Sequence, residues 1–114
     1  MSEEKIVHKT DEYIQELEEF VKNNDFDVEQ ITLKLKRIRP EVIKYGDPLV
    51  TKVLRLAYEH IEANDAFEIS YLEDEVLQEE MDDFGYFIEL LKGRDNPRNR
   101  EELKEYRDLL YAAA

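Results

Sequence analysis

The side chains in this sequence best able to do chemistry are carboxylates. No Lys or Arg occurs between Arg55 and Lys92, and the same interval holds twelve acids: Glu59, Glu62, Asp65, Glu68, Glu73, Asp74, Glu75, Glu79, Glu80, Asp82, Asp83 and Glu89. Carboxylates gathered without counter-charges can bind a hard cation, transfer protons or attract a basic partner. The spacing and context of the acids must decide among these three uses.

The pattern does not favour a metal site or a catalytic site. The acids at 79, 80, 82 and 83 lack the alternating ligands and the glycine of a calcium loop. Neither His8 nor His60 has a glutamate three residues before it, as di-iron bundles require. There is no cysteine, phosphate loop or nucleophile elbow. We therefore predict no metal, no cofactor, no catalytic residue and no enzyme activity. A ligand pocket around His60 or the Glu73–Glu80 pair is a remaining alternative.

The acids are better suited to binding a basic protein partner. An acidic surface attracts such a partner by electrostatic steering, and an exposed tyrosine can supply short-range contact. The predicted surface consists of Glu73, Glu75, Glu79, Asp82, Asp83 and Tyr86. It would suit an inhibitor of a basic enzyme, such as a toxin's immunity protein, and equally a homo-oligomeric scaffold. The simpler interpretation is a solvated helix face in an acidic protein.

A nucleic-acid-associated regulator is the alternative from a different class. Two groups of basic residues could contact phosphate: Lys34, Lys36, Arg37 and Arg39, then Arg94, Arg98 and Arg100. The net charge of −13 opposes this use, because it would repel phosphates, and residues 58–114 hold 6 Lys/Arg against 17 Asp/Glu. We therefore expect these cations to offset acids within the fold or in a homodimer.

A long acidic helix over residues 71–92 is expected to position the predicted surface. Ser70 and Glu73 form a capping box, and an apolar stripe follows at helical spacing: Leu77, Met81, Phe84, Ile88 and Leu91. Gly93 is expected to end the helix in a left-handed conformation. Glu73 and Glu80 fall within the apolar arc, so they are expected to reach water at its edge or to pair with an arginine. Gly85 weakens the helix interior.

The rest of the chain contains signals for further helices. One is expected from Thr10 or Asp11 to Asn23 or Asn24. A second begins with the Asp27–Gln30 capping box and ends before Pro40, followed by a short turn over 40–45 that closes at Gly46. A third runs from the Asp47–Pro48 start to Asn64 or Asp65. The last begins at Asn99 with Glu102, or at Asn96 with Pro97, and runs into Ala112–Ala114, which are either native or a cloning remnant.

These elements predict an all-α fold, a compact bundle of about five helices in one domain over residues 10–114. Residues 1–9 are expected to form a flexible arm. The stretch 66–69 alternates like a strand, but a lone strand has no partner, so we assign it to an earlier start of the long helix. No apolar run approaches 18 residues, so no membrane contact is expected, and the chain is assigned to the cytoplasm by default.

Overall fold

The computed structural model describes residues 2–73 and 81–114, with side chains from residue 9 onward within that range. The described part consists of α1 (Ser2–Asn23), α2 (Val28–Tyr45), α3 (Pro48–Asn64), α5 (Asp83–Lys92) and α6 (Pro97–Ala113), and it contains no strand. The prediction of an all-α bundle of about five helices is confirmed.

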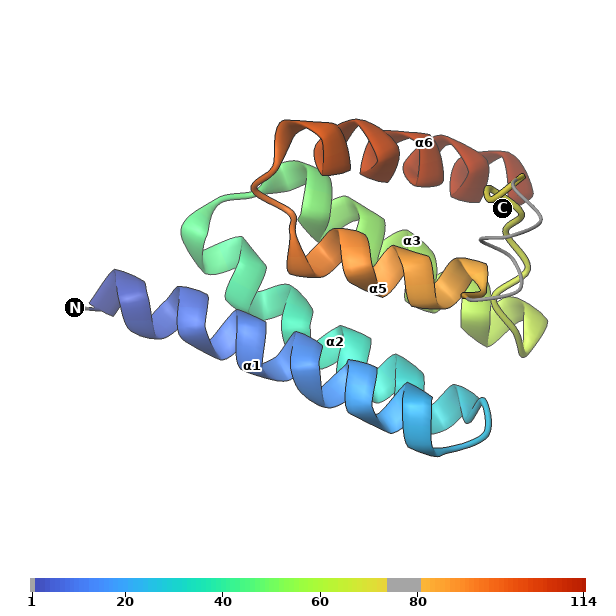
Figure 1. Cartoon of the computed structure of the whole chain (residues 1–114), viewed down its shortest axis with the longest axis horizontal. Helices are drawn as coiled ribbons and strands as arrows, with labels where there is room; N and C mark the ends of the chain where they lie inside the picture. Colours follow the sequence, from blue (N-terminus) through green and yellow to red (C-terminus); the bar gives the residue numbers. More distant parts are fainter. Residues whose placement is uncertain (1, 74–80) are drawn as a thin grey trace.

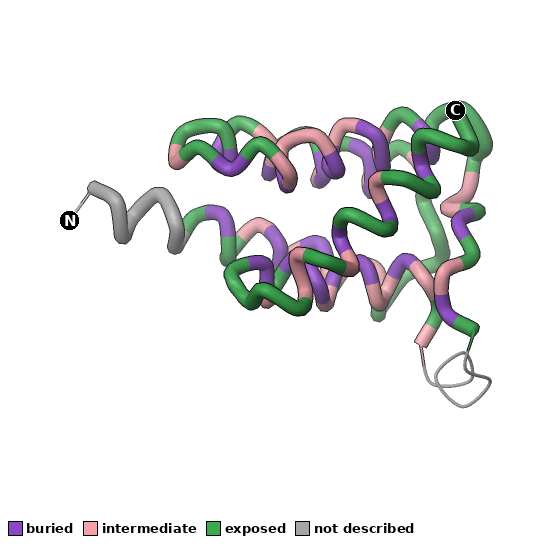
Figure 2. Tube along the Cα trace, turned by 90° about the horizontal axis from the view of Figure 1, so that it is seen from above, coloured by how far each residue is buried: buried purple, intermediate pink, exposed green. Residues whose placement is uncertain are grey.

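The helices form a closed cycle of neighbours around one core. α1 packs on α2, α2 on α3, α3 on α6, α6 on α5, and α5 returns to α1 (Figure 1). Buried and exposed residues alternate along the helices (Figure 2), as expected of helices that each place one face on a shared core. The largest fully buried side chains include Leu17, Leu35, Leu54, Phe87 and Tyr106, which come from all five helices.

The first helix begins earlier than predicted. α1 starts at Ser2, so the predicted start at Thr10 or Asp11 was wrong. Flexibility of residues 1–9 stays a prediction. The predicted end is confirmed, because α1 ends at Asn23, whose side-chain amide donates to the carbonyl of Glu19 at 2.8 Å.

The predicted break at Pro40 was also wrong, since α2 continues through this residue to Tyr45. Proline lacks the N–H that would bond one turn back, which weakens a helix interior. Ile38 and Val42, on either side of Pro40, are fully buried, and this packing favours a continuous helix. The predicted turn over 40–45 is therefore the last part of α2. Gly46 ends it in the left-handed region at φ 76°, as predicted.

The local start signals for α2 and α3 are confirmed. The Asp27 side chain accepts from the Gln30 N–H at 3.1 Å, and the Asp47 side chain accepts from the Val50 N–H at 3.2 Å. α3 ends at Asn64, and Asp65 caps it with a left-handed φ of 56°. Asp65 is thus the C-cap of α3 and does not begin another helix.

The prediction of a long acidic helix over residues 71–92 was wrong in its first part. α5 begins at Asp83, and the Asp82 side chain caps it by accepting from the Gly85 N–H at 2.7 Å. Residues 67–73, which we name the connecting segment, have no helical conformation. The Ser70–Glu73 capping box therefore opens no helix. The remainder of the predicted helix, residues 74–80, lies outside the described residues.

The connection between α5 and α6 tests two further predictions, the conformation of Gly93 and the start of the last helix. Gly93 ends α5, but its φ is −103° and not left-handed. Its lack of a side chain matters because the Asn99 amide packs against it and donates to the Gly93 carbonyl at 3.0 Å. Of the two predicted starts for the last helix, Asn96 with Pro97 is right, since the Asn96 side chain accepts from the Arg98 N–H at 2.9 Å.

Candidate functional site

A hollow of about 630 Å³ lies between the connecting segment, α5 and α6. We name it the tyrosine hollow, and its lining residues are Ser70, Tyr71, Leu72, Glu73, Tyr86, Glu102, Glu105, Asp108 and Leu109. Its wall therefore combines two phenol rings and an exposed leucine with four carboxylates. None of the described residues that line it is a Lys, Arg or His.

Two tyrosines and one glutamate order the centre of this hollow. The rings of Tyr71 and Tyr86 are stacked with centroids 6.4 Å apart. The Tyr86 hydroxyl donates to Glu102 Oε2 at 2.7 Å, and the Tyr71 hydroxyl donates to Glu102 Oε1 at 3.3 Å. Burial, followed by the hydrogen bond to Glu102, raises the pKa of Tyr86 to about 12. Both phenols therefore act as donors that orient the Glu102 carboxylate and fix the rings.

Asp83 holds the connecting segment against α5 and α6. Its Oδ1 accepts from the backbone N–H groups of Tyr71 at 2.9 Å and Leu72 at 3.2 Å. The same oxygen accepts from the buried hydroxyl of Tyr106 at 2.7 Å. Burial and this bond raise the pKa of Tyr106, so its hydroxyl remains a donor. One carboxylate oxygen thus links the segment to two helices.

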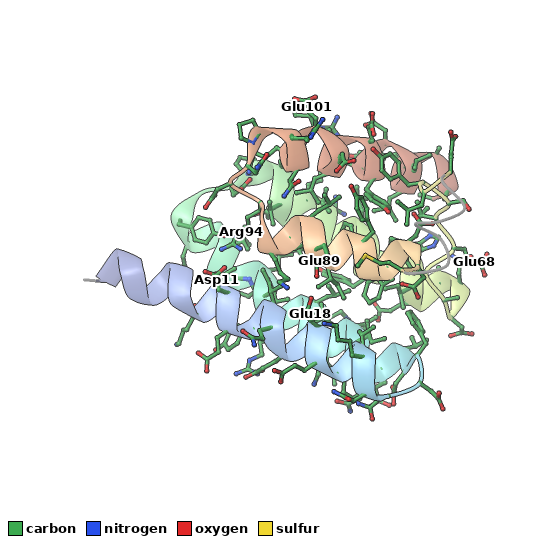
Figure 3. All side chains as sticks on the ribbon, in the orientation of Figure 1. Asp11, Glu18, Glu68, Glu89, Arg94 and Glu101 are labelled. Carbon is green, nitrogen blue, oxygen red and sulfur yellow. The ribbon has the colours of Figure 1, made fainter. Side chains whose placement is uncertain are left out.

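His60 on α3 holds the start of the connecting segment. Its Nε2 accepts from the Glu68 N–H at 3.0 Å, and its ring meets the Phe67 ring edge-on at 5.8 Å. Glu68 lies where the segment leaves the end of α3 (Figure 3). Burial lowers the pKa of His60, while the Glu68 carboxylate opposes this effect. The neutral ring is the form that fits, because a protonated Nε2 could not accept.

We expect folding stability to decrease in mild acid because of His60. Since its pKa is lowered on folding, its contribution is complete above the ordinary histidine pKa of about 6.5 and is lost as the pH falls through the folded value. Denaturant unfolding of the native chain and His60→Gln, whose amide oxygen can also accept, should be compared between about pH 7 and pH 5. An equal loss of stability in both proteins would contradict this role.

Within the described residues, three of the four carboxylates of the tyrosine hollow differ from many others in having no ion-pair partner, while the fourth, Asp108, pairs with Arg107 at 3.1 Å. Glu16 pairs with Arg37 at 2.9 Å, and Asp47 with Arg100 at 2.8 Å. Glu18 and Glu89 lie near each other across α1 and α5, and Lys92 bridges them (Figure 3). Within the described ranges, Glu73, Glu102 and Glu105 form no ion pair. Uncompensated negative charge therefore accumulates at the hollow.

The structure separates the predicted partner-binding residues into different roles. Glu73 and Tyr86 line the tyrosine hollow, and Glu73 is exposed. Asp82 caps α5, and Asp83 holds the connecting segment. Glu75 and Glu79 lie outside the described residues, as does Glu80. The prediction of this surface as a binding site stays a prediction.

The predicted basic groups are engaged mostly within the fold. On α2, Lys34 lies over the Phe20 ring, Lys36 pairs with Glu62 at 3.1 Å, and Arg39 donates to the Thr51 carbonyl. Arg94 is 3% exposed and donates to Asp11, Tyr45 and the Leu91 carbonyl. Hydrogen bonds to Asp11 and Tyr45 outweigh the effect of burial and raise the pKa of Arg94. Arg98 is exposed.

Sequence reasoning missed the part of the hollow that α6 contributes. Glu102, Glu105 and Leu109 recur at three and four residues, which places them on one side of a helix. That spacing was a usable signal. It was overlooked because Leu103, Tyr106 and Leu110 define the buried face beside it, and because all the acids of the predicted surface precede Lys92.

Compared with protein-family models, with curated proteins and with solved structures, the chain matches none. None of the described helices has the length and apolar character needed to cross a bilayer. No three His, Asp or Glu side chains in the described part of the chain come together in a way that could hold a metal ion. The functional conclusion therefore depends on the geometry of the hollow.

Proposed function

We propose that this domain is a non-enzymatic binding module that takes a basic segment of a protein partner into the tyrosine hollow. The observation that carries the proposal is the composition of its wall: among the described residues that line it are two ordered phenol rings and four carboxylates, three of them without an ion pair, and no basic side chain. Aromatic faces attract cations, and carboxylates pair with them more strongly where water is partly excluded. Inhibition of a basic enzyme is one activity that such binding could serve.

The chain itself contains a cation held by the same types of side chain. The Arg37 guanidinium lies 3.7 Å from the centre of the Tyr13 ring and pairs with Glu16 at 2.9 Å. The tyrosine hollow presents Tyr71 with Glu105 nearby in a similar combination of ring and carboxylate. An arginine from a partner could therefore make both contacts there. The planar guanidinium stacks on rings and pairs with carboxylates better than an ammonium does.

Removing two carboxylates of the tyrosine hollow should weaken binding of a cationic peptide about tenfold, because each substitution removes one direct charge contact with the peptide. The variant is Glu73→Gln with Glu105→Gln, and the probe is a fluorescein-labelled arginine–glycine peptide measured by anisotropy. Binding to the native chain should also weaken steeply as salt rises.

The matched control is Glu12→Gln with Glu19→Gln, which changes net charge equally on exposed positions of α1. It should change affinity by less than about twofold, since charges beyond a Debye length of about 8 Å are screened at physiological salt. Equal losses in the two variants would indicate general charge attraction and contradict a site at the hollow. Absence of peptide binding at low salt would overturn the proposal.

A further inference from the structure

A second hollow, of about 460 Å³, adjoins the first, because Ser70 lines both. We name it the phenylalanine hollow. It is lined by Phe26 from the α1–α2 loop, Phe67 and Ile69 from the connecting segment, and Phe84 from α5. The lining acids are Asp65, Glu68, Asp82 and Asp83, and no basic side chain is among the lining residues that the structure describes.

The aromatic rings give this hollow an apolar surface open to solvent. Phe84 meets Phe67 at 5.1 Å and Phe26 at 5.7 Å between ring centroids. Phe84 is 3% exposed, whereas Phe26 is 42% exposed. When another apolar group covers an exposed phenylalanine, apolar surface is removed from water, and this is favourable. The hollow can therefore provide contact that a purely charged ligand would not use.

We propose that the phenylalanine hollow receives an apolar anchor side chain from the same basic segment that occupies the tyrosine hollow. This inference rests on the proposed function. The partner is then a segment that combines arginines with a large aliphatic or aromatic residue. Affinity comes from the buried anchor, while the charges guide association.

Charge complementarity selects this occupant over the alternatives. The carboxylates of Asp65, Glu68 and Asp82 form no ion pair within the described part of the chain, so a cationic neighbour would gain from all three. A neutral apolar ligand would leave these charges uncompensated. A second copy of this chain would bring a further net charge of −13 and would be repelled.

The test compares arginine–glycine peptides of equal length and charge on the full chain. In one series, leucine replaces each glycine in turn, so that every spacing between arginine and anchor is sampled. At the spacing that reaches the hollow, leucine should tighten binding about tenfold, because most of its side chain becomes buried. In Phe26→Ser this gain should disappear, while binding of the peptide without leucine stays unchanged.

The matched control is Leu33→Ser, which removes another exposed apolar side chain, 55% exposed on α2, that lines neither hollow. It should keep the leucine gain. If no leucine position improves binding by more than about twofold, or if the gain persists in Phe26→Ser, the anchor site is overturned while the proposed function stands. If the arginine–glycine peptide does not bind at all, both fail.

Discussion

Replacing Arg94 by alanine is expected to lower the free energy of unfolding by about 3 kcal/mol, because it removes a buried charge with several partners. Arg94 Nε donates to the Tyr45 hydroxyl at 2.8 Å, and its Nη1 donates to Asp11 at 2.8 Å and to the Leu91 carbonyl at 3.1 Å. The residue follows α5 and reaches α1 and α2, so its loss weakens contacts among three helices. Arg94 and Asp11 face each other in Figure 3.

The free energies of unfolding of the native chain and of Arg94→Ala are measured by urea denaturation. They are compared where the dependence on urea concentration has a similar slope in the two proteins. Arg98→Ala, an exposed arginine on α6, is the matched control and should change stability by no more than about 0.5 kcal/mol. Arg94→Lys should recover only part of the loss, since an ammonium cannot reproduce the planar set of donors. A loss in Arg94→Ala as small as in the control would show that these bonds contribute little.

Replacing Asp83 by alanine should also cost about 3 kcal/mol, because hydrogen bonds to a charged acceptor are among the strongest in proteins. The change leaves the backbone N–H groups of Tyr71 and Leu72 without this acceptor and removes the closest partner of the buried Tyr106 hydroxyl. The connecting segment should then open locally. Amide hydrogen exchange should accelerate at Tyr71 and Leu72 more than at residues in α2.

Two comparisons separate this role from a general loss of charge. Asp82→Ala removes an acid next in sequence that caps α5, and it should cost about 1 kcal/mol. Tyr106→Phe combined with Asp83→Ala should cost less than the sum of the single changes, because both remove the same bond. Additive losses, with unchanged exchange at Tyr71, would rule out Asp83 as the residue that holds the segment.

Sequence patterns predicted the helix starts correctly where a local signal met no competing contact. Asp27 and Asp47 each accept from an N–H three residues later, and such bonds depend on nothing else in the fold. The buried stripes were predictable for the same reason: Leu103, Tyr106 and Leu110 follow from helical spacing. In α6, a regular period therefore indicated both the existence of the helix and its buried face.

The prediction failed where a distant contact competed with a local pattern. Ser70 and Glu73 resemble a helix start, yet the N–H groups of Tyr71 and Leu72 bond to Asp83, which is 12 and 11 residues away. Pro40 resembles a stop, but burial on both sides of it keeps α2 continuous. In both cases tertiary interactions exceeded the preference of a short stretch.

By itself, the sequence determined the all-α class, the caps of α2 and α3 and the acidic excess of the second half. Only the tertiary structure decided which acids lie close together and which have a basic ion-pair partner, because ion pairing depends on contacts between helices. Asp47 and Arg100 are 53 residues apart and bond at 2.8 Å, whereas Glu102 comes to lie beside Tyr71 and Tyr86 with no basic partner among the described residues. Closure of the cycle of helices brings α6 against the connecting segment, and the tyrosine hollow exists for that reason.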